Sequence, residues 1–288
     1  PEAEYQFKHP LTQEVAYRSQ LRERRGRVHV AVATALAEVH ADTLDEHAAL
    51  LAHHWDSAGD DAEAARWHER AAAWLETRDP QAGRRHWERL LELCGEAPAS
   101  TELSRAAIRA STRLIDLGVN LGLEFARGES LYCRGRALAA QLDDPNLEAG
   151  LIASFTRLAN FSGSNSSARE GTQEALRLMR RVSDPRALGE LIFAAANGLA
   201  FDGRSSEGLA LVDAALASGK VNENTPVPLA RLFTMRGSLL NMLGRLPEAQ
   251  VSLDRATELL ADKGQVLLAL TTELISSYTF LQRSTPVG

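Results

Sequence analysis

Apolar residues recur at helical spacing on both sides of a short break in the stretch 229–260. Before the break, apolar residues fall on one face of an α-helix at Leu229, Leu232, Phe233, Leu240 and Leu243, which are three, four or seven positions from another member of the set. A second apolar line follows at Ala249, Leu253, Ala256 and Leu260. Gly244 and Arg245 interrupt the pattern, and Pro247 and Glu248 suit the first turn of a new helix, where Pro loses no hydrogen bond and a carboxylate faces the positive dipole end. The stretch therefore predicts a helical hairpin.

Large and small residues alternate in this hairpin as in a tetratricopeptide-type repeat. Gly237, Ala249 and Ala256 are small, whereas Phe233 and Leu253 are large. Such a hairpin cannot bury its own apolar face and needs neighbouring copies. We therefore expect an all-α fold, a right-handed superhelix of antiparallel helix pairs that forms a tetratricopeptide-like α-solenoid.

Other parts of the chain repeat the pattern. The residues Ala196, Leu199, Gly203, Gly208 and Ala215 align with Gly237, Leu240, Gly244, Ala249 and Ala256 at an offset of 41 residues. Gly59, Ala64 and Ala71 occupy the same relative places in an earlier pair. The offset exceeds the about 34 residues of a standard repeat, and we assign the excess mainly to a polar loop over 218–228.

Turn signals divide the chain into about a dozen expected helices. Asp79, Asp144 and Asp184 each precede a proline, so each predicts a capped helix start. We expect one continuing helical pattern over 5–37, turns at 118–122 and 163–167, and a last helix over about 265–281. The apolar face of that last helix, formed by Leu267, Leu270, Leu274, Tyr278 and Leu281, has no successor to cover it. The first and last residues suggest a piece of a longer protein.

Composition narrows the class of protein. The chain has 288 residues, a formal charge of −6 and only 6% aromatic residues, which favours helices packed through small residues and argues against a nucleic-acid-binding body. Cys94 and Cys133 match no metal or redox spacing and suggest reduced thiols in the cytoplasm. The sequence contains no apolar run near the roughly 18 residues of a membrane span and no recognisable signal peptide.

An arginine cluster lies near the beginning of the chain, at Arg18, Arg22, Arg24, Arg25 and Arg27. It fits a solvated helix face or, chiefly through Arg18, Arg22 and Arg25, a contact with another domain. The alternative is phosphate contact in nucleic-acid binding. Strong non-specific DNA binding uses about 6–10 phosphate contacts, and five arginines partly offset by Glu23 on an acidic chain fall short.

Candidate chemistry is sparse. His53, His54 and His68 could be imagined as metal ligands, but no carboxylate or cysteine completes a set, so we interpret them as surface or interhelical histidines. The Gly-Ser tract over 163–167 lacks the Lys-Ser/Thr of a phosphate-binding loop. Isolated acids such as Asp202 and Asp213 have no base or metal set. We expect no catalytic, cofactor-binding or metal-binding residue and no enzymatic activity in this segment.

Arginines that interrupt the apolar lines are the candidates for contacts with a partner in the groove of the stack. They are Arg177, Arg204 and Arg236, which we expect to point off the first helices of their hairpins. Buried stems with solvated head groups would explain the same pattern.

One string near the start resembles a known junction. The residues Phe7-Lys8-His9-Pro10-Leu11-Thr12-Gln13-Glu14-Val15-Ala16-Tyr17 are similar to the segment after the ATPase core of bacterial signal-transduction ATPases, many of which carry a class III adenylate/guanylate cyclase domain. The resemblance continues at Arg24-Arg25 and His29. It resumes at Leu44-Asp45-Glu46, Leu50-Leu51-Ala52-His53-His54-Trp55, Ala58-Gly59-Asp60 and Ala64-Ala65-Arg66-Trp67. The stretch 18–21 departs from it, because a more apolar sequence is usual there.

This resemblance implies a helical block over 1–95 that follows an upstream ATPase region, and tetratricopeptide-like repeats over 96–288. It implies a non-catalytic regulatory and protein-interaction segment, joined in cis to ATPase and cyclase domains that would use ATP and magnesium. The alternative is the helical arm of an ATP-dependent transcription regulator. A protein, peptide or small molecule would bind the repeats; we expect no direct nucleic-acid contact.

Overall fold

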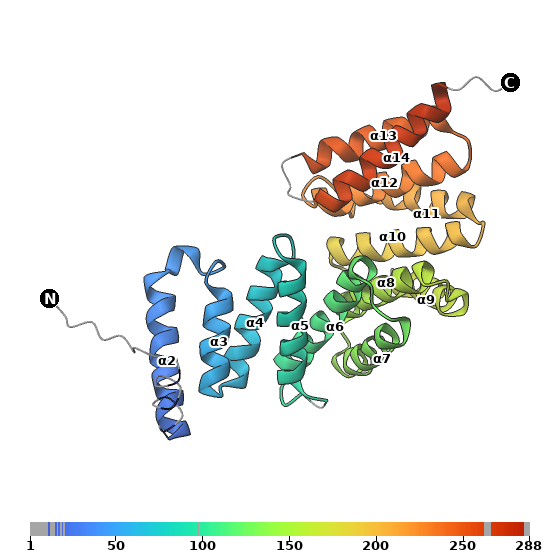
Figure 1. Cartoon of the computed structure of the whole chain (residues 1–288). Helices are drawn as coiled ribbons and strands as arrows, with labels where there is room; N and C mark the ends of the chain where they lie inside the picture. The colour runs from blue at the N-terminus through green and yellow to red at the C-terminus, as the bar shows by residue number, and fades with distance from the viewer. Residues whose placement is uncertain are drawn as a thin grey trace. The chain divides into compact units, whose positions relative to one another are not determined.

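The computed structural model describes residues 11, 15, 17, 19, 21–96, 98–261 and 266–284. Within these ranges the chain forms thirteen α-helices and one 3₁₀-helix, with no β-strand, so the predicted all-α class is confirmed (Figure 1). The chain divides into two compact units, residues 1–110 and 111–288. This division falls inside a helix, whereas the sequence places its boundary between residues 95 and 96, in the loop before that helix; that boundary and the handedness of the superhelix stay predictions.

Unit 1 is a series of helices in which each contacts the next along the chain (Figure 1). Its elements are α2 (Arg22–Val39), a 3₁₀ turn (Ala41–Thr43), α3 (Ala48–Ala58), α4 (Asp61–Leu75) and α5 (Pro80–Cys94). Tryptophans lie between these helices: Trp67 and Trp87 are only 5% and 3% exposed. Both side chains therefore belong to the core of unit 1.

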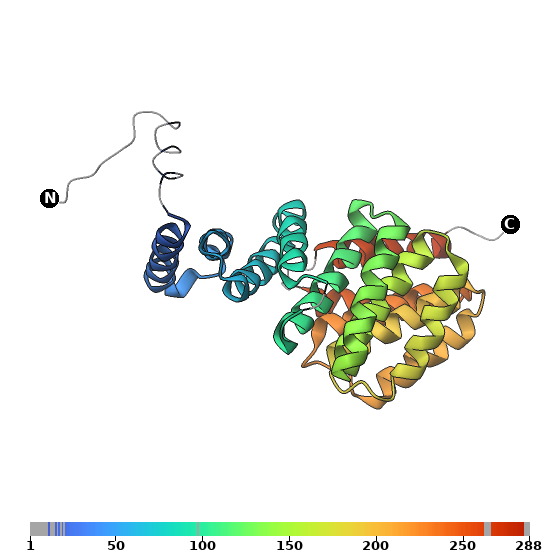
Figure 2. The same cartoon turned by 90° about the horizontal axis from the view of Figure 1, so that it is seen from below.

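Unit 2 consists of helical hairpins followed by one further helix (Figure 2). Its elements are α6 (Thr101–Leu121, entering from unit 1), α7 (Phe125–Leu142), α8 (Pro145–Phe161), α9 (Asn165–Leu178), α10 (Pro185–Phe201), α11 (Ser205–Ser218), α12 (Pro226–Met242), α13 (Leu246–Leu260) and α14 (Val266–Ser284). The helix α10 also contacts α8 and α12. We call α6, α8, α10 and α12 the A helices and their partners α7, α9, α11 and α13 the B helices.

Five helices end in the same C-terminal backbone motif. The closing glycines Gly59, Gly122, Gly163, Gly203 and Gly244 have φ between 71° and 79°. In each case the next residue's N–H bonds to the carbonyl five residues back, as from Arg204 to Leu199 at 2.8 Å and from Arg245 to Leu240 at 2.9 Å. This is a Schellman motif, which favours glycine because a side chain is strained at positive φ. The last four glycines, from 122 to 244, lie 41, 40 and 41 residues apart and set the period of unit 2.

The predicted helix starts are confirmed at three aspartates. Asp79 accepts a hydrogen bond from the Ala82 N–H at 2.9 Å, and Asp184 accepts one from the Ala187 N–H at 2.9 Å. Asp144 accepts from two backbone N–H groups. In each helix proline occupies the first turn, so the sequence signal and the local structure agree.

Three expected boundaries are wrong. The turn at 118–122 is shorter, because Gly118 is helical and leaves room for the side chain of Leu123, and α6 ends only at Leu121. The loop at 163–167 is shorter as well, since α9 begins at Asn165. The first helical pattern does not continue through Leu21, whose ψ of 139° breaks it before α2; residues 5–10 of that pattern lie outside the described residues.

The last helix has the expected position and an uncovered apolar face. Leu270, Leu274 and Tyr278 on α14 are 56%, 72% and 57% exposed. The side chains of Leu267 and Leu281, which the sequence assigns to the same face, lie outside those that the structure describes.

Candidate functional site

The A helices of unit 2 present equivalent positions on one common face, which we call the A-face. It is formed by the residues 13, 6 and 2 positions before each closing glycine. Separations of seven and four residues bring such positions to the same side of an α-helix. The opposite sides of the A helices pack on B helices: a Cβ added to Gly237 of α12 would lie 2.6 Å from Cγ of Leu253 in α13.

Charged side chains join neighbouring A helices across this face. Arg157 of α8 bonds to Asp116 of α6, and its Nη1 donates to Oε2 of Glu190 in α10 at 2.9 Å. Arg231 of α12 donates from Nη1 to the same Glu190 oxygen at 2.7 Å. Arg113 approaches Asp116 at 3.6 Å. We call these five residues the charge cluster; they run from α6 to α12 with one or two charges on each helix.

Burial and the alternating charges shift the pKa values in the charge cluster. Burial alone would raise the pKa of Asp116, but Arg157 and Arg113 outweigh it and lower that pKa. Burial opposes the charged form of Arg157 as well, and Asp116 and Glu190 more than offset it, so its pKa is raised. For Arg231 burial prevails and the pKa is lowered. Arg157 thus bonds to two carboxylates, whereas Arg231 bonds to Glu190, which it shares with Arg157.

A row of exposed apolar side chains lies at the other end of the A-face. Phe161, Phe201 and Met242 occupy the position two residues before the closing glycine in α8, α10 and α12, and they are 65%, 60% and 63% exposed. The rings of Phe161 and Phe201 meet edge to face, with centroids 6.3 Å apart. We call these three residues the apolar row. Three equivalent exposed positions on consecutive repeats favour contact with a partner.

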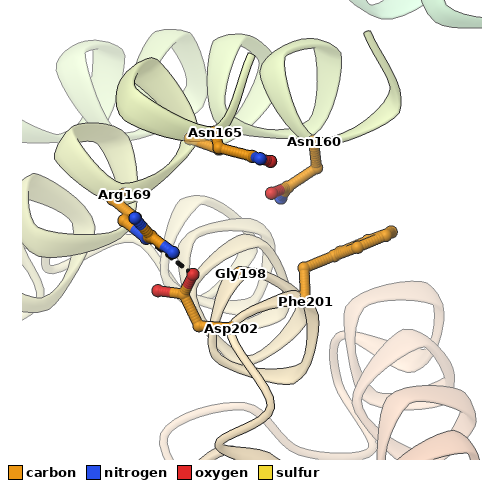
Figure 3. Close-up of a pocket in the computed structure, with 7 residues that line it drawn as sticks. Asn160, Asn165, Arg169, Gly198, Phe201 and Asp202 are labelled. Atoms are coloured by element: carbon orange, nitrogen blue, oxygen red, sulfur yellow. Dashed lines mark hydrogen bonds and ion pairs between the residues drawn. The ribbon is translucent and has the colours of Figure 1, made fainter. Parts of the chain in front are cut away.

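A small cleft opens beside Phe201, as Figure 3 shows. Its lining includes Asn160, Asn165 and an ion pair between Arg169 and Asp202 at 2.8 Å. Its volume of about 90 Å³ is well below the roughly 300 Å³ of a typical small-molecule site. The Nδ2 group of Asn160 is buried there without a hydrogen-bond partner, so the cleft suits one small acceptor such as a backbone carbonyl.

The three arginines predicted to contact a groove partner are not brought together on the A-face. Arg177 lies exposed on α9, a B helix, and Arg204 directly precedes α11, where it pairs with Glu207. Only Arg236 lies on an A helix, and it donates to Asp213 at 2.7 Å and to Ser252 at 2.7 Å, on the B-helix side. This corrects the expectation that all three point off first helices. These arginines were predicted because each interrupts an apolar line with a charge. The helix on which each one lies, and the side of that helix it occupies, place them away from a common face.

The arginines predicted to contact another domain have separate surroundings. Arg22 is exposed on α2, and the guanidinium of Arg25 lies 4.9 Å from the ring centre of Tyr17. Arg18 lies outside the described residues. Contact with an upstream domain stays a prediction for all three.

Two pairs of histidines meet between helices. Nδ1 of His29 in α2 lies 2.9 Å from Nδ1 of His54 in α3, and Nδ1 of His68 in α4 lies 2.8 Å from Nδ1 of His86 in α5. The interhelical interpretation of His54 and His68 is thus confirmed. In the part of the chain that the structure describes, no three His, Cys, Asp or Glu side chains are arranged to hold a metal ion.

Sequence reasoning missed the charge cluster and the apolar row. The apolar row recurs at a fixed distance before the closing glycines, and that signal was available in the 40–41-residue spacing. The contacts within the charge cluster join different helices, and the spacing gave no signal for them. Within the described helices, none is long and apolar enough to cross a membrane.

No protein-family model matches the chain, and no curated protein matches it.

Proposed function

We propose that this chain is a non-catalytic helical-repeat module that binds a protein partner on the A-face of unit 2. The observation that carries the proposal is the recurrence of exposed apolar side chains at one position of three consecutive A helices, Phe161, Phe201 and Met242. Solvent-exposed apolar groups repeated in register favour burial by a partner. The small polar cleft beside them favours a polypeptide over a free small molecule.

In finer detail, we propose a regulatory segment of a larger bacterial signalling protein in the cytoplasm. The resemblance at 7–17 supports an upstream ATPase coupled to an adenylate/guanylate cyclase, which would bind ATP and magnesium. The alternative is the arm of an ATP-dependent transcription regulator. Partner binding on the A-face would then bias the conformation of the attached switch through its differential affinity for two states.

The test uses the gene with its natural flanking sequence. In that full-length protein, Phe201→Ser combined with Met242→Ser removes most of the apolar row, and Val251→Ser is the matched control because Val251 is 68% exposed on the B helix α13. We expect the double variant to change cyclase output, or DNA binding for the alternative parent, at least threefold. The control should leave it unchanged.

Two results would contradict the proposal. One is equal output from the double variant and the wild type while circular dichroism shows both folded. The other is nucleotide turnover by the 288-residue chain alone, which would make the segment an enzyme.

A further inference from the structure

The first helix of unit 1, α2, carries a second line of apolar residues besides the one that packs on α3 (Figure 1). The line consists of Leu21, which immediately precedes the helix, and of Val28, Val32 and Val39. These side chains are 80%, 53%, 36% and 77% exposed. Separations of seven and four residues bring them to one side of the helix. We call these four residues the α2 stripe.

The α2 stripe lies opposite the side of the helix that is already buried. Ala33 is fully buried, and Ala37 packs against the same core cluster, which includes residues of α3 and α4. Nine residues, or two and a half turns, separate Val28 from Ala37, so the two point in opposite directions. Valine has no advantage for helix formation either. Four aligned and exposed apolar side chains therefore favour contact with a partner.

The spacing of the α2 stripe is the same in both directions along the chain. Seven, four and seven residues separate its successive members, so the stripe is symmetric about position 30. A second copy of α2 that runs antiparallel, with a two-fold axis at this position, would place Val28 against the second copy's Val32. It would place Leu21 against the second copy's Val39. Two-fold interfaces, in which one patch contacts itself, are the commonest in homo-oligomers.

The charges along one edge of the α2 stripe are complementary in the same arrangement. Arg24 and Glu38 are exposed and share this edge, because the fourteen residues between them make close to four turns. Arg24 stands six residues before position 30 and Glu38 stands eight residues after it. Each Arg24 would therefore lie level with the second copy's Glu38 to within two residues, or about 3 Å along the axis, which the long arginine side chain can span. The symmetry forms this pair twice.

We propose that two copies of this chain associate through the α2 stripe, as an antiparallel and two-fold symmetric pair of α2 helices. The apolar side chains form the centre of the contact, and the two pairs of Arg24 with Glu38 border it. One helix face is a small area, so the contact belongs to the weak and reversible class of interfaces. The inference is independent of the proposed function, because the A-face belongs to unit 2.

Sedimentation equilibrium of the full chain over a series of concentrations tests the proposal. The wild type should show a reversible equilibrium between monomer and dimer. Val28→Gln combined with Val32→Gln removes the centre of the α2 stripe and should abolish the dimer. The matched control is Val251→Gln, because Val251 is 68% exposed on α13 in unit 2. The control should leave the dissociation constant within about twofold of the wild type, as for an ordinary surface substitution.

Charge reversal tests the antiparallel register. Arg24→Glu and Glu38→Arg each turn two attractions into two repulsions and should each weaken the dimer about tenfold. Both changes in one chain restore opposite charges and should return the dissociation constant to within about threefold of the wild type. An equimolar mixture of the two single variants should form a heterodimer, because one chain then has only acids at these positions and the other only arginines. The heterodimer also shows that both single variants fold.

Three results would overturn the inference. A chain that stays monomeric at every concentration would point to another domain as the occupant of this helix, as predicted for Arg22 and Arg25. A dimer that survives the change of Val28 and Val32, with unchanged circular dichroism, would place self-association on another surface. Single charge variants that the combined variant does not rescue would exclude the antiparallel register. Each of these results would leave the proposed function of the A-face standing.

Discussion

The two units share one plan, helices in antiparallel pairs, but fill the polar positions between helices differently. In unit 1 neutral imidazoles meet across helices, as in the pair His68–His86. Permanent charges meet between helices in both units, as between Arg89 and Asp56 in unit 1 and between Arg157 and Glu190 in unit 2. The imidazole pairs are therefore what distinguishes unit 1. All eight histidines and all four tryptophans lie within residues 1–110. The comparison teaches that one backbone plan tolerates chemically different contacts, and that these contacts give the units different sensitivities to pH and substitution.

The largest effect should come from filling a close helix contact in unit 2. Gly237→Val should lower the free energy of unfolding by about 3 kcal/mol, because the new side chain collides with Leu253 of the B helix. Gly150→Ala is the matched control: the added Cβ lies 3.6 Å from Thr112, so helix propensity should raise stability by about 0.5 kcal/mol. Urea unfolding, monitored by hydrogen exchange of α8–α13, measures the free energy of unfolding of both variants. Equal effects of the same sign would contradict the assigned packing.

Breaking the charge cluster should have the next largest effect. Arg157→Met should cost about 2.5 kcal/mol, below the range for fully buried pairs, because it removes the guanidinium that bonds to both Asp116 and Glu190 in a site that is only partly solvated. The control Arg169→Met removes an arginine that is 63% exposed and should cost under about 0.5 kcal/mol. If both substitutions cost the same, the cluster contributes no more than a surface ion pair.

Acid should destabilise unit 1 before unit 2. Burial, chiefly, and the neighbouring His86 lower the pKa of His68 to about 4, although Asp56 opposes this shift. The unfolded chain binds the proton more readily, so this stability is complete above pH 6.5 and is lost as pH falls from there through about 4. At pH 5 the loss should be about 2 kcal/mol, given about 1.36 kcal/mol per pKa unit.

The surroundings of this pair define the measurement. Besides Asp56, two arginines act on the pair His68–His86. Arg89, which is bonded to Asp56, lowers the pKa of His68, and Arg85 lowers the pKa of His86. Tryptophan fluorescence reports unit 1 alone, and hydrogen exchange of α8–α13 reports unit 2. His86→Gln should flatten the pH dependence of the fluorescence transition between pH 6.5 and 4. An unchanged slope would show that other groups cause it.

The smallest effect should be common to both units. Asp79→Ala in unit 1 and Asp184→Ala in unit 2 each remove the side-chain acceptor of a helix start and should each cost about 1 kcal/mol. Thermal unfolding with the same two probes compares them. A large difference between the two would show that the cap depends on its tertiary surroundings.

Local signals in the sequence predicted much of the fold. The Asp-Pro pairs, the glycines at 59, 203 and 244, and the apolar periodicity each act within a few residues, and the structure confirms the helices they predicted. The wrong boundaries have tertiary causes or depend on a single dihedral angle. Gly118 looked like a turn residue but is a helical position that admits Leu123.

The same distinction between local and tertiary signals applies to the candidate site. The sequence by itself determined the repeat period and contained the recurrence of an apolar residue at 161, 201 and 242, because both are spacings along the chain. The structure showed that these apolar residues are exposed. Only the tertiary structure decided that Arg157 and Arg231 meet one oxygen of Glu190 while Arg236 bonds to the B-helix side. Those residues lie 33, 41 and 23 positions from their partners. The physical reason is that an arginine's long side chain selects its carboxylate from the helices packed around it, and the spacing within one helix does not specify that choice.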